Sequence, residues 1–402
     1  MQLAFYSGLG GAIYVQIFGT FAVAEIFLVF ISVVAILYFG KLPRNLNFLL
    51  LFTVLWVVGI LVSDLYNKAQ ISNTIKLVGS VSLFYIDILA FYIIFRKNIK
   101  LVPYFLAGSS ISYLLQFYVF PPPLAAEMFG RDFSEIEVVM LTWVALTHYV
   151  AMMAVSGILW YFSYRRISLI LNLIAAVGAL YLGSRAYFLV GMISLAILLF
   201  THYILLRRGS SPERRVGFSQ LLILFVVIIF SIFLATLIYQ EAAKNDILGD
   251  YAYNKFSEQA NVEGLGLASG RLDFFESLYS VAQRPILGYG SYAIDDLGVQ
   301  TDFYKLIGAN GKESKELIPC HSHILGAWVW SGILSLPFWL FAFWHIGRNL
   351  FYNYDERFIG VIIPYSIFIF WHMLFSPIGY RVDLAFLIGL IFALRQPRLL
   401  DT

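Results

Sequence analysis

Residues 46–62 read LNFLLLFTVLWVVGILV, a run that contains no charged side chain. An α-helix rises about 1.5 Å per residue, so roughly 20 mostly apolar residues cross the hydrocarbon core of a bilayer. Irregular chain and open strands cannot cross that core, because their backbone N–H and C=O groups would find no hydrogen-bond partners there. The run therefore predicts a membrane-spanning α-helix, which ends at the polar pair Ser63 and Asp64.

Similar apolar runs recur along the whole chain. Together with the first, they cover approximately residues 14–39, 46–62, 77–95, 101–120, 138–162, 167–182, 187–206, 218–239, 323–346, 359–375 and 384–394. Charged residues make up only 13% of the chain, whereas a soluble domain carries about 25%. The sequence therefore predicts an all-α fold, a polytopic integral membrane helical bundle with about 11–12 transmembrane helices and one large loop. Residues 3–18 decide between the two numbers, because they form either a short additional span or a helix at the membrane surface.

The chain divides into three parts: membrane helices with short loops in residues 1–238, a large loop in 239–322, and C-terminal membrane helices in 323–402. Loops on the cytoplasmic side of a membrane carry an excess of Lys and Arg. Of the 27 Lys and Arg residues, 15 fall in one alternating set of short loops, 5 in the other set and 7 in the large loop. The large loop is thus predicted to be extracytoplasmic and the C-terminus cytoplasmic. The side of the N-terminus depends on the number of spans.

One segment of the large loop has the spacing of an amphipathic helix. Within residues 271–283, apolar side chains stand three and four positions apart, and they are Leu272, Phe275, Leu278, Tyr279 and Ala282. Ser269 or Gly270 would cap the start of this helix. Arg271 would then lie in the first turn, where free backbone N–H groups favour an anion. Residues 295–319, rich in Asp, Lys, Glu and Gly, are expected to form an exposed flap.

Several cationic or titratable residues at the outer face are candidates for chemistry. Arg185 lies at an outer turn, where an arginine either reaches the lipid headgroups or presents a fixed cation to a substrate. Arg284 is either a solvated loop charge or an anion ligand, whereas the guanidinium of Arg271 is placed to match phosphate oxygens. His321 and His323 precede an apolar run. Such histidines either form hydrogen bonds at the membrane interface or, for His321, act as a general base near neutral pH.

Four further residues fall within or near the apolar runs: Glu25, Asp87, His148 and His372. They either belong to a proton or substrate path or are satisfied by a neighbouring helix, and for Glu25 we favour the neighbouring helix. The single cysteine, Cys320, excludes an intramolecular disulfide and a Cys-rich metal site. No residue cluster predicts a metal site, no cleavable signal is expected, and no nucleic-acid partner is expected for a chain with a net charge of +3.

Three short motifs, in this order, resemble the bacterial O-antigen polymerase and O-antigen ligase superfamily. The first is Gly183-Ser184-Arg185, which is followed by an apolar run. The second begins at Ser269-Gly270-Arg271 and continues through an aromatic-rich helix to RPILGYG at residues 284–290. The third is His321-Ser322 with GIL at residues 332–334. The resemblance covers roughly residues 180–340.

The resemblance implies a glycosyltransferase of the bacterial inner membrane, multi-pass, with its active site on the periplasmic side and without a metal or other cofactor. The implied donor is an undecaprenyl-diphosphate-linked oligosaccharide, and the other implied partners are membrane lipids and a chain-length regulator protein. His321 would be the base for the acceptor hydroxyl, and Arg185 and Arg271 would neutralise the leaving diphosphate. The residues expected to bind substrate are Arg284, His323, Tyr289 and Tyr279. We therefore predict that the large loop folds onto the Arg185 turn, with His321 at the seam.

Three functions remain open at this point. A polymerase transfers the glycan to another lipid-linked repeat unit, and a ligase transfers it to lipid A-core. We favour the polymerase, because Ser335 and Leu336 stand where ligases of this superfamily tend to have Gly-Thr. A transporter or flippase is the third alternative, against which stands the lack of an internal repeat and of paired broken helices in the sequence.

Overall fold

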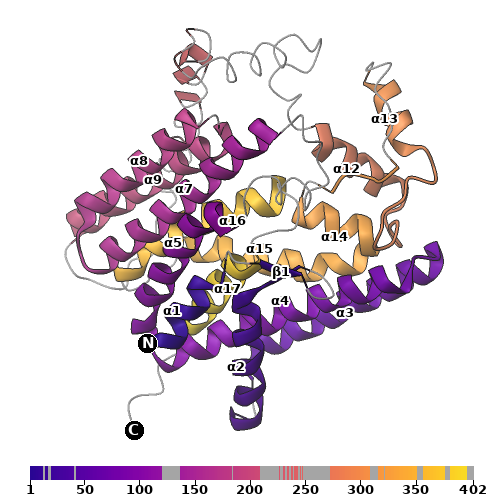
Figure 1. Cartoon of the computed structure of the whole chain (residues 1–402), viewed down its shortest axis with the longest axis horizontal. Helices are drawn as coiled ribbons and strands as arrows, with labels where there is room; N and C mark the ends of the chain where they lie inside the picture. Colours follow the sequence, from indigo (N-terminus) through magenta and orange to yellow (C-terminus); the bar gives the residue numbers. More distant parts are fainter. Residues whose placement is uncertain are drawn as a thin grey trace.

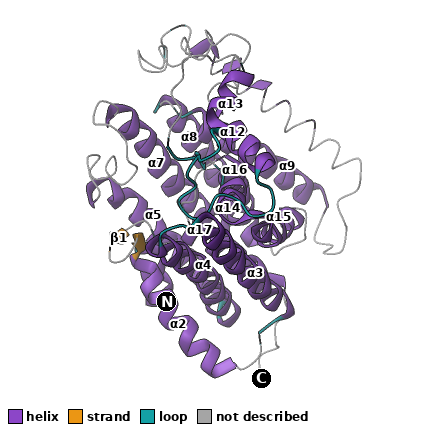
Figure 2. Ribbon diagram, turned by 90° about the vertical axis from the view of Figure 1, so that its right-hand side faces the viewer, coloured by secondary structure: helices purple, strands orange, loops and turns teal. Residues whose placement is uncertain are grey.

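The computed structural model describes residues 1–11, 14–16, 20–39, 42–119, 136–182, 184–208, 272–307, 316–320, 322–350, 356–375 and 381–395, with a few further residues between 226 and 247. The helices of this part are α1 (Gln2–Leu9), α2 (Val23–Phe39), α3 (Arg44–Asn67), α4 (Ile71–Lys97), α5 (Val102–Val119), α7 (Ile136–Tyr161), α8 (Arg165–Tyr181), α9 (Arg185–Arg208), α12 (Leu272–Gln283), α13 (Val299–Leu306), α14 (His323–Ser331), α15 (Leu336–Leu350), α16 (Ile359–Phe375) and α17 (Arg381–Arg395). Short 3-10 helices cover Ile99–Leu101, Gly332–Ser335 and Glu356–Phe358. The long helices form one bundle, and α12 and α13 lie together at one end of it (Figure 1, Figure 2).

Six helical segments of the described chain are long and apolar enough to cross a membrane. They are Arg44–Asn67, Ile71–Lys97, Val144–Tyr161, Arg185–Tyr203, His323–Leu350 and Glu356–Phe375. The prediction of a helical, multi-pass membrane protein is thereby confirmed. The number of 11–12 spans and the side of the membrane on which each loop lies stay predictions, and the predicted span 218–239 falls almost entirely outside the described residues.

The N-terminal region differs from the predicted single run over residues 14–39. Its first part is a hairpin, in which β1 (Tyr14–Gln16) pairs antiparallel with β2 (Thr20–Ala22), and only then does α2 begin. Helix α1 is 8 residues long, or about 12 Å, too short to cross a bilayer. It packs closely on α5 instead: a Cβ atom on Gly8 would lie 2.1 Å from the carbonyl oxygen of Phe105. Small residues permit such close helix contacts in membrane proteins.

Aromatic rings fill the centre of the bundle. Phe105 of α5 stacks on Phe386 of α17 with 4.2 Å between ring centroids, and Phe91 of α4 meets both rings edge-on. Edge-to-face and offset pairs suit the quadrupoles of aromatic rings. All three rings are buried. The contacts join α4, α5 and α17 and so fix the N-terminal end of α17, which matters for the pocket described below.

The large loop contains the predicted helix, and the side that this helix buries carries polar residues. Helix α12 covers Leu272–Gln283, as the spacing predicted. Phe275 and Leu278 are 42% and 46% exposed, whereas Glu276 and Ser280 are fully buried. Glu276 accepts a hydrogen bond of 2.8 Å from the Tyr304 hydroxyl, and the carbonyl oxygen of Ser280 accepts one of 3.0 Å from Tyr289. These polar partners come from distant parts of the loop, so helical spacing gave no sign of them.

The prediction of an exposed flap over residues 295–319 is wrong for the described part of that segment. Helix α13 lies there, and its residues Val299 and Phe303 are buried. Asp295 caps the helix by accepting hydrogen bonds from the backbone N–H groups of Val299 and Gln300 at 2.8 and 2.9 Å. The flap residues therefore belong to a small hydrophobic core that also includes the side of α14.

Candidate functional site

The C-terminal end of α16 is the place where three separate segments of the chain meet. The first segment is the start of α9. The ring of Tyr187 lies 6.0 Å from the ring of His372 and 6.3 Å from that of Phe368. Tyr187 is two residues beyond Arg185, so the Arg185 turn lies beside the last two turns of α16.

The other two segments come from the large loop. Phe274, in the first turn of α12, has its ring centroid 5.3 Å from that of Phe375, the last residue of α16. Ser322 donates a hydrogen bond of 2.9 Å to the carbonyl oxygen of Met373 and caps α14 by accepting one of 3.1 Å from the Leu325 N–H. The described part of the loop thus packs on the same helix end as the Arg185 turn. Arg271 and His321 themselves lie outside the described residues.

Arg185 is the first residue of α9, and the residue before it caps the helix. The hydroxyl of Ser184 accepts a hydrogen bond of 3.4 Å from the Tyr187 N–H, and its carbonyl oxygen accepts one of 3.2 Å from the Phe188 N–H. The N-terminal end of a helix carries a partial positive charge, because its first N–H groups point outward along the axis. The half-buried Arg185 side chain adds a full positive charge at this place. Together they favour an anion.

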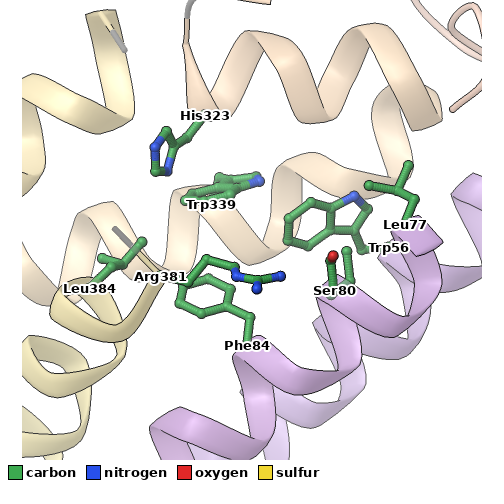
Figure 3. Close-up of a pocket in the computed structure, with 9 residues that line it drawn as sticks. Trp56, Leu77, Ser80, Phe84, His323, Trp339, Arg381 and Leu384 are labelled. Atoms are coloured by element: carbon green, nitrogen blue, oxygen red, sulfur yellow. The ribbon is translucent and has the colours of Figure 1, made fainter. Parts of the chain in front are cut away.

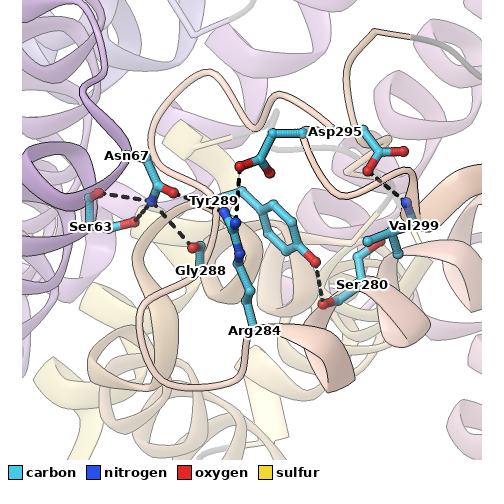
Figure 4. Close-up of polar contacts among 9 residues, drawn as sticks. Ser63, Asn67, Ser280, Arg284, Gly288, Tyr289, Asp295 and Val299 are labelled. Carbon is cyan, nitrogen blue, oxygen red and sulfur yellow. Dashed lines mark hydrogen bonds and ion pairs between the residues drawn. The ribbon is translucent and has the colours of Figure 1, made fainter.

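Arg284 joins the loop to the membrane bundle (Figure 4). Its guanidinium donates a hydrogen bond of 3.0 Å to Asn67, at the end of α3, and forms an ion pair of 2.9 Å with Asp296. The same group lies 5.0 Å above the ring centroid of Tyr289. Asn67 in turn donates to the carbonyl oxygen of Gly288 at 3.3 Å. Arg284 therefore has a structural role, and its role as a substrate ligand stays a prediction.

The two loop tyrosines predicted to contact sugars also have partners within the protein. Tyr289 is only 3% exposed, and its backbone N–H donates to the carbonyl oxygen of Val329 at 2.6 Å. Burial raises the pKa of Tyr289 to about 12, so the phenol stays protonated and donates its hydrogen bond to Ser280. The ring of Tyr279 lies 5.8 Å from that of Phe303 in α13. Both tyrosines thus hold the loop together, and sugar stacking by either one stays a prediction.

Replacing Arg284 with lysine should loosen the loop. A lysine keeps the charge but lacks the planar fork that reaches Asn67 and Asp296 at once. We expect the free energy that holds the loop on the bundle to fall by about 1–3 kcal/mol, which is the usual cost of losing a hydrogen bond to a charged group. Hydrogen exchange should become faster at the backbone amides of Tyr289 and Ser291, of which the latter donates to Asp64 at 2.6 Å.

The matched control is Lys305→Met, which removes an exposed ion pair with Asp302 within α13. Such surface pairs contribute about 0–1 kcal/mol, so exchange at Tyr289 and Ser291 should stay as in the unmodified protein. Equal protection of these two amides in the Arg284→Lys variant would show that Arg284 does not hold the loop.

A pocket lies next to the meeting point of the three segments (Figure 3). It is a small pocket lined by Trp56, Leu77, Ser80, Val81, Phe84, His323, Trp339, Arg381 and Leu384. His323 is 2% exposed, and its ring meets the ring of Trp339 edge-on at 5.5 Å. Of the predicted site residues that are described, His323 is the one that lines this pocket.

Sequence reasoning did not select Arg381, although it lies on the pocket wall. Its guanidinium pairs with Glu25 of α2 at 2.8 Å, and the other Glu25 oxygen accepts a hydrogen bond of 2.8 Å from the Ala22 N–H. The expectation that a neighbouring helix satisfies Glu25 is thus confirmed. The available signal was a buried acid in one apolar run and a base beside another. Pairing the two requires knowing that α2 and α17 are close in space.

No model of a known protein family matches this chain, and no curated protein matches it. The motifs quoted from the sequence, and the geometry of the residues around them, therefore carry the functional interpretation.

Proposed function

We propose that the protein is a polysaccharide polymerase of the O-antigen type, a membrane glycosyltransferase that works without a metal. In this proposal the donor is a glycan on undecaprenyl diphosphate, and the acceptor is a hydroxyl of another lipid-linked repeat unit on the periplasmic face. The observation that supports it most is the meeting of three segments at the C-terminal end of α16. Tyr187, Phe274 and Ser322 make these contacts, and each lies within three residues of Arg185, Arg271 or His321.

This arrangement suits the transfer of a sugar from a diphosphate. As the bond from the anomeric carbon to the diphosphate oxygen breaks, negative charge develops on the leaving diphosphate. Arg185, at the positive end of α9, stabilises that charge together with Arg271 in a site with little water. His321 takes the proton of the acceptor hydroxyl, which then forms the new glycosidic bond. When the product departs, the histidine releases this proton to the water of the periplasm and is ready to act as a base again.

The choice of polymerase over ligase depends on the acceptor. Ser335 and Leu336, which depart from the ligase motif, stand where the 3-10 helix Gly332–Ser335 passes into α15. The Ser335 hydroxyl donates to the carbonyl oxygen of Gly332 at 2.9 Å and is fully buried. The Ser335 side chain therefore stabilises the local turn. The Gly-Thr pair of the ligases has no counterpart at this position.

One experiment separates the three functions. The purified protein is reconstituted in lipid bilayers and incubated with a lipid-linked repeat unit alone. A ladder of products that differ by one repeat unit supports the polymerase. Product that forms only after lipid A-core is added supports the ligase, and repeat units that cross the bilayer without any transfer support the flippase.

Arg185→Lys should lower the rate of transfer strongly while the protein still inserts. A lysine keeps the charge but offers a point charge in place of two parallel N–H donors. Loss of one oriented donor to developing charge typically costs about 10²–10³-fold in rate. The measurement is the initial rate of polymer formation at saturating donor, together with the amount of protein in the membrane. Arg271→Lys should behave alike.

The control for the arginine variants is Arg166→Lys. Arg166 is an exposed residue in the first turn of α8. The neighbouring Arg165 pairs with Glu356, just before α16 begins. Arg166 therefore lies near the N-terminal end of α16, whereas the proposed site lies at its C-terminal end. Its lysine variant should polymerise at the unmodified rate. A fully active Arg185→Lys protein would limit Arg185 to anchoring the chain in the membrane.

A further inference from the structure

The outward side of α12 has the wrong composition for a helix that faces water. The exposed residues of the segment 272–286 carry no charge, and they are Phe275, Leu278, Ala282, Gln283, Pro285 and Ile286. The side of α12 that faces α13 and α14 (Figure 1) instead buries the polar residues Glu276, Ser277 and Ser280. A surface helix of a soluble domain shows the reverse, with apolar side chains inward and polar ones outward. The outward side therefore faces an apolar neighbour.

The two ends of α12 are attached to the ends of two candidate membrane spans. In its first turn, the ring of Phe274 lies 5.3 Å from that of Phe375, where α16 ends. Shortly after its last turn, the carbonyl oxygen of Gly288 accepts a hydrogen bond of 3.3 Å from Asn67, where α3 ends. Both α3 and α16 are long and apolar enough to cross a membrane. The 12 residues of α12 extend about 18 Å, so the helix lies across the ends of these spans.

The turn that follows α12 reaches the apolar part of the bundle. The carbonyl oxygen of Ile286 accepts a hydrogen bond of 3.1 Å from the Ile333 N–H. Two residues before Ile333, the carbonyl oxygen of Ser331 lies 2.7 Å from the position that a Cβ atom on Gly59 would take. Gly59 belongs to the charge-free run 46–62 of α3. Ile286 is therefore close to the last turns of that run, where the hydrocarbon core of a bilayer gives way to the headgroups.

The exposed apolar surface continues from Ile286 onto a membrane span. Ile286 is 68% exposed, and its neighbour Ile333 is 47% exposed. Leu340 stands seven positions after Ile333 and Trp344 four positions later, the spacing of one helix face, and they are 59% and 63% exposed. All three belong to the candidate span His323–Leu350, whose exposed apolar side chains suit lipid. The same lipid is thus the neighbour next to Ile286.

We propose that α12 lies in the membrane interface, where Phe275, Leu278, Ala282 and Ile286, the outer stripe, contact the acyl chains of lipids. An amphipathic helix in this position sinks its apolar face about 5–10 Å into the boundary between headgroups and acyl chains. The usual partner of the opposite face is water, whereas here it is the protein. The large loop is therefore held from two sides, by polar contacts with the bundle and by lipid.

This placement requires a membrane protein but no particular activity. Arg271 is the residue that precedes α12. In combination with the proposed function, the placement brings Arg271 to the level of the lipid headgroups, where the diphosphate of a lipid-linked donor also lies.

The test identifies the surroundings of the outer stripe in the full-length protein in lipid nanodiscs. Cys320→Ser removes the single cysteine, and Phe275→Cys or Leu278→Cys then receives a nitroxide label. EPR measures how often the label collides with oxygen, which concentrates in hydrocarbon, and with a nickel chelate, which stays in water. Leu61→Cys is the lipid control, because Leu61 is 50% exposed at the end of the run 46–62. Asp302→Cys is the water control, because the Asp302 side chain is 60% exposed on α13.

Labels at Phe275→Cys and Leu278→Cys should collide with oxygen as often as the label at Leu61→Cys, and with the nickel chelate much less often than the label at Asp302→Cys. Collisions with the chelate as frequent as at Asp302→Cys would overturn the proposal, because the stripe would then face water. Rare collisions with both reagents would overturn it as well and assign the stripe to a contact with protein, such as a second copy of the chain.

A second measurement needs no substitution. The unmodified protein is irradiated in nanodiscs whose phospholipids carry a diazirine on an acyl chain, and mass spectrometry locates the adducts. Adducts on residues 275–286 support the interfacial helix, whereas adducts on α3 and none on residues 275–286 overturn it. Neither measurement depends on polymer formation, so a preparation that makes no polymer counts against the proposed function alone.

Discussion

Replacing Gly332 with alanine is expected to separate the returning loop from the membrane bundle. Gly332 ends α14 with φ of 67° and ψ of −164°, a backbone conformation that essentially only glycine adopts. A Cβ atom at this position would lie 1.9 Å from the carbonyl oxygen of Ile286 and 2.6 Å from its carbonyl carbon. That carbonyl oxygen also accepts a hydrogen bond of 3.1 Å from the Ile333 N–H. The methyl group and the hydrogen bond therefore cannot both fit.

The expected destabilisation of the Gly332→Ala variant has two causes, the backbone strain and the clash of the methyl group. The backbone strain alone is about 1–3 kcal/mol, and the clash forces residues 285–291 away from α14. In detergent solution the variant should unfold at a lower temperature, and the loop should be cut faster by a protease than that of the unmodified protein. Polymer formation should fall with it, because the loop carries two of the proposed catalytic residues.

Alanine substitutions at two other glycines distinguish the effect of backbone strain from that of the clash. Gly298 has a φ of 67° in open space, and Gly79 lies in α4 with nothing within 4 Å of its would-be Cβ. Gly298→Ala should therefore show backbone strain without a clash, and Gly79→Ala neither. An unfolding temperature and a rate of proteolysis for Gly332→Ala equal to those of Gly79→Ala would contradict the proposed packing at the loop.

The parts of the fold that depend on local composition could be predicted from the sequence. The charge-free run 46–62 lies inside α3, and the run 359–375 has the bounds of α16. The run 14–39 differs from its prediction, because an uninterrupted apolar stretch does not distinguish strand from helix by its periodicity. Its first part contains YVQ and TFA, rich in the β-branched and aromatic residues that favour strands.

Contacts between distant segments could not be predicted in the same way. The spacing in α12 located the helix but gave no sign that Glu276 is buried against a tyrosine 28 residues further on. Likewise, Arg284 was recognised as a candidate, while its partner Asn67 lies 217 residues away and has no motif around it. Polar pairs of this kind depend on which helices are neighbours in space, and a single sequence does not contain that information.

The candidate site likewise depends on contacts between segments that are distant in the sequence. That the loop folds onto the Arg185 turn stays a prediction; the described contacts of Tyr187, Phe274 and Ser322 bring both segments to the C-terminal end of α16. The aromatic pocket was missed, because Trp56 and Trp339 look like ordinary members of apolar runs. Their unused N–H groups become visible only when the surrounding atoms are in place.

His321→Ala is expected to abolish polymer formation. A positioned general base typically contributes about 10²–10⁴-fold to the rate, and the acceptor hydroxyl has no other proposed base. The variant should insert normally and bind the lipid-linked donor with unchanged affinity, because the arginines hold the diphosphate. The effect should therefore appear in kcat and not in KM for the donor. Added imidazole should restore part of the rate, since it can enter the space left by the side chain and take the proton.

The control variant for His321→Ala is His202→Ala. His202 lies on α9 at the end away from Arg185, with its ring 5.9 Å from that of Trp160. The Trp160 indole donates to the carbonyl oxygen of Glu356, before the start of α16. The His202→Ala variant should make polymer of unchanged yield and length, because this end of the bundle is far from the proposed chemistry. If His321→Ala made polymer of normal yield and length, the base would have to be sought elsewhere. A loss without rescue by imidazole, accompanied by a lower unfolding temperature, would assign His321 to the structure and not to proton transfer.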